Sequence, residues 1–302
     1  MRLLASIPIP TCNAKRAIAE AMQSGSLGHG RGRRSESWAT APSIAGRKRA
    51  ENCMFGLSGR VLVTGGTRGI GRAISLRFAR AGASVTANYV RNQKAAEELK
   101  AIAEKERLPI DLCRADLTTT DGLEQIQRSI SETGEPLSGL VHCAATGVHR
   151  PLPELTARHF DWTFALNVRV FFELMKALAD RFSKGASVVA ISSVGAVRAL
   201  PYYSLVGSSK GALEALARHL AVELAPRGVR VNILAPGAVA TEAWKGIPDG
   251  EARIAAAIDR TPTGRVVTPE EVATAAQFLC SQAASGIVGH TLVVDGGAAI
   301  PA

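Results

Sequence analysis

Short apolar runs alternate with longer amphipathic stretches along most of this sequence. From residue 60 onward, seven runs rich in β-branched residues predict strands, at 61–64, 85–88, 110–114, 139–143, 187–192, 230–234 and 291–294. Between them, six stretches with a helical period lie at 70–81, 93–106, 120–132, 156–182, 204–225 and 269–281. Because several of these strands have consecutive rather than alternating apolar residues, both faces of the sheet should be covered. The pattern predicts an α/β fold, a single Rossmann-type, doubly wound parallel sheet of about seven strands with helices on both faces.

Two segments stand outside this alternation. The stretch at about 238–268 follows the carboxyl end of a strand, where open α/β sheets bind ligands, and we expect it to be a substrate lid. Residues 1–53 show no sustained apolar period and carry nine basic against three acidic side chains. They predict a disordered or dispensable basic extension, before a domain at 54–302. An organellar transit peptide is the alternative interpretation of this extension.

The composition narrows the classes of function. The 302 residues are 46% hydrophobic and 21% charged, as in globular proteins, and no apolar run is long enough to span a bilayer. Five cysteines without C-x-x-C spacing favour a reduced, cytoplasmic protein with no metal site. More than half of the net charge of +10 falls in the first 53 residues, where aromatic side chains do not interleave the basic ones. Nucleic-acid binding is therefore not expected.

A glycine-rich turn between the first strand and the first helix is the clearest candidate site. The run TGGTRGIG occupies residues 64–71. Its glycines would let the backbone approach a pyrophosphate, and the helix N-terminus would supply N–H donors and partial positive charge. In this context the run predicts a dinucleotide-binding turn rather than a plain tight turn. Its candidate binding residues are Gly65, Thr67, Arg68, Gly69, Ile70 and Gly71.

The end of the second strand indicates which dinucleotide binds. Enzymes that use NAD place an acidic side chain there, on the ribose 2′-hydroxyl. This chain has no acid from 84 to 96 and carries Arg91 instead. Because Arg68 and Arg91 could pair with a 2′-phosphate through charge-assisted hydrogen bonds, the sequence favours NADPH over NADH. For each arginine, the alternative is an ordinary solvated cation.

Later motifs make residues 57–300 resemble the short-chain dehydrogenase/reductase family. Besides the glycine turn, the motifs are Asp116-Leu117, Ser192-Ser193, Lys210, Pro236-Gly237 and Asp295-Gly296-Gly297. The resemblance implies a nicotinamide cofactor, with Asp116 and Leu117 at its adenine ring and Lys210 on its nicotinamide ribose. The other cofactor-binding residues that it implies are Ala144, Pro236, Gly237, Val239 and Thr241.

Two departures from the family pattern narrow the expected reaction. The usual Asn-Asn-Ala-Gly after the fourth strand is replaced by HCAA at 142–145, where His142 and Cys143 are expected to pack rather than react. The tyrosine that usually precedes the lysine by four residues is replaced by Val206, and Tyr203 stands seven residues before Lys210. This Tyr-x6-Lys spacing resembles the NADPH-dependent type III enoyl-(acyl carrier protein) reductases.

The longer spacing has a chemical rationale. It keeps the tyrosine on the helix face that carries the lysine but sets it back by roughly 4.5 Å. In an enoyl thioester, hydride goes to C3 while charge builds on the thioester oxygen, so a more distant donor suits the reaction. We expect NADPH-dependent reduction of the C2=C3 bond of trans-2-enoyl thioesters, on acyl carrier protein or coenzyme A, in fatty-acid or related acyl-chain biosynthesis. Tyr203 would donate a hydrogen bond to that oxygen, and Lys210 would lower the pKa of the phenol.

Several alternatives stay open on the sequence alone. Tyr202 is the rival phenol, and Ser193 either contacts the substrate or only bonds to the backbone. A reductase of 3-oxoacyl thioesters or other carbonyls would use similar residues, and a catalytically silent NADP(H) sensor would bind without turnover. The family resemblance also implies a homodimer or homotetramer formed through the helices at 156–182 and 204–225.

Overall fold

Seven parallel strands form one sheet, in the order β3-β2-β1-β4-β5-β6-β7. The computed structural model describes residues 55–242, 244 and 249–300. The strands are β1 Arg60–Thr64, β2 Ser84–Tyr89, β3 Ile110–Arg114, β4 Leu137–His142, β5 Phe182–Ile191, β6 Arg230–Pro236 and β7 Thr291–Val294. The chain starts at the centre of the sheet and winds outward in both directions. This confirms the predicted doubly wound α/β fold.

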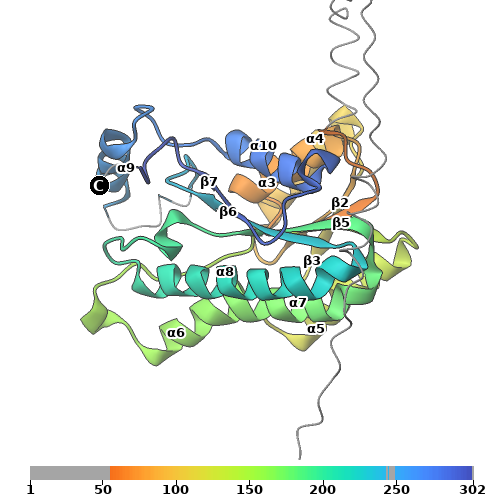
Figure 1. Ribbon diagram of the computed structural model, residues 1–302, viewed down its shortest axis with the longest axis horizontal. Coiled ribbons are helices and arrows are strands. Elements are labelled where there is room, and N and C mark those ends of the chain that lie inside the picture. The colour runs from red at the N-terminus through yellow and green to blue at the C-terminus, as the bar shows by residue number, and fades with distance from the viewer. Residues whose placement is uncertain (1–54, 243, 245–248, 301–302) are drawn as a thin grey trace, which may run out of the picture. The chain divides into compact units, whose positions relative to one another are not determined.

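Helices cover both faces of the sheet. The principal helices are α3 Gly69–Arg80, α4 Gln93–Glu106, α5 Thr120–Glu132, α6 Ala157–Phe164, α7 Val170–Leu178, α8 Ser204–Leu224, α9 Gly250–Arg260 and α10 Pro269–Cys280. Figure 1 shows α3, α4 and α10 on one face and α5 to α8 on the other, with α9 beyond one end of the sheet. Within the described residues, no helix is both long enough and apolar enough to cross a membrane.

Two separate apolar cores hold these layers together. Leu62 of β1 packs into the core beneath α5, α7 and α8, whereas Val61 and Val63 pack into the core beneath α3 and α10. All five residues of β1 are buried. Because neighbouring side chains along a strand point to opposite faces, the middle of a strand buried on both sides is apolar at every position, as Val61, Leu62 and Val63 are in β1. The continuous apolar runs in the sequence have this origin.

The predicted helix at 156–182 is the main difference between pattern and structure. It is interrupted by a π-helical turn at Ala165–Arg169, and Phe182 begins β5 rather than ending the helix. The buried Asn167 in this turn accepts from Thr146 N and donates to Thr146 O and Ser209 Oγ, each at 2.9 Å. The turn thus joins the loop after β4 to α8. A hydrophobic period cannot reveal such an interruption, since it depends on a partner distant in sequence.

Of the two segments that interrupt the alternation of strands and helices, the structure describes only the second, and that in part. The basic extension at 1–53 lies outside the described residues, as do residues 243 and 245–248 of the expected lid. The described part of that segment contains α9, and Val239 pairs with Val267 across its base. The segment therefore leaves and rejoins the fold at one place beside β6.

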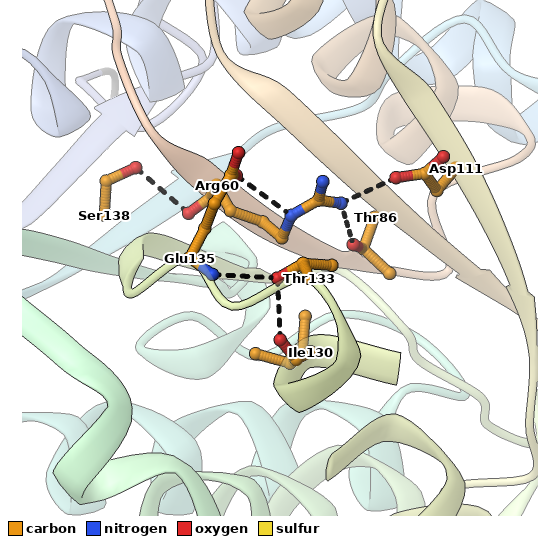
Figure 2. A network of polar contacts seen from close by, with 7 residues as sticks. All are labelled: Arg60, Thr86, Asp111, Ile130, Thr133, Glu135 and Ser138. Atoms are coloured by element: carbon orange, nitrogen blue, oxygen red, sulfur yellow. Dashed lines mark hydrogen bonds and ion pairs between the residues drawn. The ribbon is translucent and has the colours of Figure 1, made fainter. Parts of the chain in front are cut away.

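Arg60 anchors the amino-terminal edge of the sheet. Its guanidinium is almost fully buried and donates to Asp111 Oδ2 at 2.7 Å, Thr86 Oγ1 at 3.1 Å and Glu135 Oε2 at 3.3 Å (Figure 2). Its backbone carbonyl accepts from Ser138 Oγ at 3.0 Å. This network links β1 to β2, β3 and the segment before β4 with the cation fully partnered inside the chain.

Candidate active site

The glycine-rich turn has the backbone that a dinucleotide requires. Gly65 and Gly69 adopt the left-handed region, with φ of 63° and 52°, which favours glycine. A Cβ on Gly71 would collide with the Gly65 carbonyl, and one on Gly66 would lie 2.8 Å from the Val63 carbonyl. The turn is therefore closed tightly on itself by glycines. This fits the close backbone approach that a pyrophosphate needs.

The helix that follows the turn begins without a side-chain cap. Arg68 is its N-cap and makes no capping hydrogen bond, and the first turn of α3 holds no acidic side chain. The first N–H groups of the helix and their partial positive charge are thus left for an anion. Thr241, from the segment after β6, lies beside this point, because a Cβ on Gly69 would sit 3.7 Å from Thr241 Cγ2. The residues present fit a dinucleotide phosphate.

Arg68 and Arg91 lie on neighbouring segments. Gly66 N donates to Asn88 O at 2.9 Å, which joins the turn to the end of β2 just before Arg91. The Asn88 side chain is buried and donates to the Cys113 and Ala115 carbonyls, so it serves the sheet. Both arginines are exposed, and within the described part of the chain neither makes a hydrogen bond or ion pair through its side chain. This edge therefore presents two cations.

The expected adenine-binding pair is only partly oriented toward a ligand. The Leu117 side chain is buried in the core, so any contact it makes with a ligand must come from its backbone. Asp116 Oδ1 accepts from the Thr118 hydroxyl at 2.6 Å and from its amide at 3.0 Å. Asp116 thus shapes the turn after β3 with one oxygen and keeps hydrogen-bonding capacity on the other.

Thr64 connects the glycine turn to the end of β4. Its Oγ1 accepts from Cys143 N at 3.1 Å and Ala144 N at 3.0 Å, so its own proton is donated to His142 Nδ1 at 3.1 Å. His142 therefore carries its proton on Nε2, which has no partner among the described residues. Burial, with a smaller contribution from Lys210, lowers the pKa of His142 to about 3. His142 is thus a neutral packing residue, as predicted for this position.

Ser193 and Tyr203 meet directly. Ser193 Oγ accepts from Gly195 N at 3.1 Å, and the Tyr203 hydroxyl lies 3.2 Å from the same oxygen. Ser193 thus makes the backbone bond of one alternative and also contacts the candidate phenol, and its contact with substrate stays a prediction. A Cβ on Gly195 would lie 2.5 Å from Tyr203 Cε1, so this glycine provides the space that the phenol ring fills.

The ionisation of Tyr203 differs from the expectation. Burial raises the pKa of Tyr203, and the hydrogen bond with Ser193 opposes this only in part. The predicted lowering by Lys210 is wrong for this structure, because burial dominates. A raised pKa keeps the phenol protonated at neutral pH. The Tyr203 hydroxyl is accordingly a hydrogen-bond donor.

Lys210 is buried at the end of β5. Its ammonium group donates to Ile191 O at 2.7 Å, and the residue is only 5% exposed. Burial lowers the pKa of Lys210 to about 8, although Cys143 and Glu214 favour its charged form. Lys210 can therefore lose its proton at a pH only slightly above neutral, where an ordinary lysine stays charged.

Val206 stands where the family usually has its tyrosine, and Tyr202 is the alternative candidate for the phenol. Val206, at the family's usual tyrosine position, is buried, and a Cβ on Gly147 would collide with it. Tyr202 is 48% exposed, and its ring lies under Arg253, whose Cζ is 5.1 Å from the ring centroid. The usual position is therefore filled by packing, and of the two tyrosines only Tyr203 bonds to Ser193.

The remaining expected cofactor residues lie after β6. Pro236 ends that strand, and Gly237 N donates to Val294 O at 3.0 Å. A Cβ on Gly237 would lie 2.8 Å from Asp295 Cβ, so glycine permits β6 and the end of β7 to come together. The Val239 carbonyl accepts from Trp244 Nε1 at 2.7 Å.

Two residues beside this constellation were missed from the sequence. Buried Glu214 accepts from Ser192 Oγ at 2.6 Å and lies one helical turn after Lys210. His149, on the loop after β4, places its ring 5.4 Å from the Tyr203 ring. The four-residue spacing could have indicated Glu214, whereas His149 carries no sequence signal. No group of three or more His, Cys, Asp or Glu side chains in the described part of the chain is arranged to hold a metal ion.

A cavity of about 620 Å³ opens beside Tyr203. Its walls come from the loops after β4 and β5 and from the start of α8, and its apolar rim includes Leu152, Val197 and Leu200. Arg150 and Arg198 also line it. An apolar cavity with cationic groups can accept an elongated apolar ligand with an anionic portion.

Comparison with known proteins agrees with this geometry. The family described as enoyl-(acyl carrier protein) reductase matches residues 65–299. The 1-cyclohexenylcarbonyl-CoA reductase of Streptomyces collinus is 34% identical over 243 residues, which cover 80% of this chain and 87% of the relative.

Two solved structures share the fold. The L-sorbose reductase of Gluconobacter frateurii, complexed with NADPH and L-sorbose, is 27% identical with a TM-score of 0.76, covering 82% of this chain and 99% of that one. A short-chain dehydrogenase of Burkholderia cenocepacia in complex with NADP is 30% identical with a TM-score of 0.72 over the same shares. With the fold, the glycine turn and the match over residues 65–299, the chain belongs to the short-chain dehydrogenase/reductase family of nicotinamide-dependent oxidoreductases.

Proposed function

We propose that this protein uses NADPH to reduce the C2=C3 double bond of trans-2-enoyl thioesters. The observation that carries the proposal is the position of Tyr203, which stands seven residues before Lys210 and whose half-buried hydroxyl lies 3.2 Å from Ser193 Oγ. Val206 fills the place where a carbonyl reductase of this family has its tyrosine. The hydrogen-bond donor is thus displaced along the chain, as a remote thioester oxygen requires.

The catalytic roles follow from the state of each side chain. Tyr203, protonated because burial raises its pKa, donates to the thioester oxygen while enolate charge develops there. Ser193, whose Oγ lies 3.2 Å from the Tyr203 hydroxyl, would orient the phenol by donating its own proton to the phenol oxygen when Tyr203 donates to the substrate. Lys210, held at the Ile191 carbonyl, places an ammonium group at the end of β5 toward the nicotinamide ribose. A bound nicotinamide supplies the hydride that C3 of the substrate accepts.

Binding of the cofactor is assigned to the turn and the strand ends around it. The uncapped start of α3 would hold the pyrophosphate, with Gly65, Thr67, Gly69, Ile70 and Gly71 forming the turn. Arg68 and Arg91 would pair with the 2′-phosphate, which supports NADPH rather than NADH. The adenine is assigned to Asp116 and the backbone of Leu117. The nicotinamide side is assigned to Ala144, Pro236, Gly237, Val239 and Thr241.

The substrate class has independent support. The relative from Streptomyces collinus is named for the reduction of an unsaturated acyl-CoA. The apolar rim of the cavity beside Tyr203 suits an acyl chain, and Arg150 suits the phosphate of a pantetheine arm, whether on acyl carrier protein or coenzyme A. Exposed apolar side chains on α7 and α8, Phe172 at 43% and Val222 at 76%, support a homodimer or homotetramer.

A second candidate is the reduction of a carbonyl, such as a 3-oxoacyl thioester. The contact between Ser193 and Tyr203 favours it, because two hydroxyls at one point could also hold a ketone oxygen. The similarity to L-sorbose reductase supports the same candidate.

Substrate comparison separates the two candidates. Purified protein is mixed with NADPH and either crotonyl or acetoacetyl thioester, each on coenzyme A and on acyl carrier protein, and the products are identified by mass spectrometry. We expect saturated butanoyl thioester from the crotonyl substrate. Consumption of the acetoacetyl substrate alone would establish the carbonyl reductase, and NADPH binding without turnover of either would indicate a sensor.

A further inference from the structure

His149 lies directly beside the candidate phenol. It belongs to the loop after β4, and its half-buried ring packs against the Tyr203 ring with centroids 5.4 Å apart and planes at 45°. Gly195 also approaches the phenol ring, where a Cβ would lie 2.5 Å from Tyr203 Cε1. The Tyr203 ring is therefore packed against both the imidazole and the backbone of the loop after β5.

Arg253 extends this contact to α9. Its guanidinium lies 5.1 Å from the centroid of the Tyr202 ring, and its charge contributes to lowering the pKa of His149. A cation over an aromatic face is attracted by it, so Tyr202 holds Arg253 near the site. The four side chains His149, Tyr203, Tyr202 and Arg253 thus join three segments that are distant in sequence.

We propose that His149 is a positioning residue, which fixes the Tyr203 ring for hydrogen bonding and couples it to α9 through Arg253. The proposal rests on the proposed role of Tyr203 and adds a residue to it. His149 acts through the phenol rather than on the substrate. The arrangement works with a neutral imidazole, because a charged one would place two cations side by side.

Charges around His149 set the direction of a pH effect. The groups that act on it are Tyr203, which its ring contacts, and Arg253 from α9, whose guanidinium lies over Tyr202, with Arg150 next to it on its own loop. Burial first, and Arg253 second, lower the pKa of His149 below 6.5. Protonation at acid pH would repel Arg253 and loosen the contact with Tyr203. Activity should therefore fall as the pH drops through this lowered pKa.

Three variants test the coupling through the pH profile of kcat/KM. We expect the wild type to show an acid limb with a pKa below 6.5, His149→Phe to lose that limb, and Arg253→Gln to move it up toward 6.5, since a repelling cation is gone. His149→Ala should lower kcat by about tenfold at pH 8, where His149→Phe restores most of it by keeping a ring against Tyr203. His290→Phe, an exposed histidine on another part of the fold, should leave the profile unchanged.

A second measurement does not depend on the substrate. The imidazole of His149 is titrated by NMR, with its resonance assigned by its loss in His149→Phe, in the wild type and in Arg253→Gln. A higher pKa in Arg253→Gln supports the coupling even if crotonyl thioester is not the substrate. An unchanged pKa, or an acid limb that persists in His149→Phe, would overturn the proposal and leave the proposed function intact.

Discussion

The amino-terminal and carboxyl edges of the sheet differ in whether their arginines are paired within the chain. At the amino-terminal edge, buried Arg60 is satisfied by Asp111, Glu135 and Thr86, all from the same chain. At the carboxyl edge, Arg68 and Arg91 are exposed and make no side-chain hydrogen bond or ion pair within the described ranges. At the amino-terminal edge the buried cation is paired with carboxylates of the same chain. At the carboxyl edge two cations are left for a ligand.

The same contrast holds for the buried ionisable groups. Arg60 keeps a carboxylate at 2.7 Å, and no such close carboxylate partner of Lys210 is found among the described residues. Burial consequently lowers the pKa of Lys210 to about 8 and raises the pKa of Tyr203. Perturbed groups gather at functional sites because chemistry needs them near a change of state. We therefore expect the amino-terminal edge to contribute stability and the carboxyl edge to contribute reactivity.

The largest expected effect concerns Lys210. Lys210→Met should lower kcat/KM by about 100-fold or more, because the variant loses the cation that we propose binds the nicotinamide ribose. Since the pKa of Lys210 is about 8, wild-type activity should fall as the pH rises through that value. Lys210→Arg stays protonated, so this alkaline limb should disappear from its pH profile. An identical limb in Lys210→Arg would assign the titration to another group.

A smaller effect is expected from the two exposed arginines. Arg68→Ala and Arg91→Ala should each raise the KM for NADPH by about tenfold while leaving the KM for NADH nearly unchanged, because only NADPH has a 2′-phosphate. Steady-state kinetics with both cofactors measures this. Arg72→Ala is the matched control, since Arg72 already pairs with Glu98. Equal losses for the two cofactors would show that these arginines do not select the phosphate.

The smallest effect is expected at the amino-terminal edge. Arg60→Met should lower the free energy of unfolding by only about 1–2 kcal/mol, because the Asp111 and Glu135 side chains are 64% and 48% exposed and can be hydrated once the arginine is gone. Denaturant titration measures this, and kcat/KM should stay within about twofold of the wild type. Arg265→Met, which breaks an exposed pair with Glu271, should change stability less. A large loss of activity in Arg60→Met would contradict the division between the edges.

Most of the fold could be predicted from the sequence, because each strand and helix has a hydrophobic pattern of its own. The predicted bounds of β3 and β7 match the structure, and those of α4 and α5 do as well. The π-helical turn around Asn167 was not predictable, since it depends on contacts with Thr146 and Ser209. For the candidate site, motifs indicated Ser193, Tyr203 and Lys210 but not the pKa of the phenol, which burial determines. The contact of His149 with Tyr203 likewise exists only after folding.

The most direct test is single-turnover oxidation of NADPH by crotonyl thioester in Tyr203→Phe and Tyr202→Phe. Tyr203→Phe should slow the step by about 100- to 1,000-fold with the Kd for NADPH retained, because its hydroxyl acts only as charge develops. Tyr202→Phe keeps the ring that faces Arg253 and should stay within about threefold of the wild type. Unchanged turnover in Tyr203→Phe, together with a large loss in Tyr202→Phe, would contradict the account.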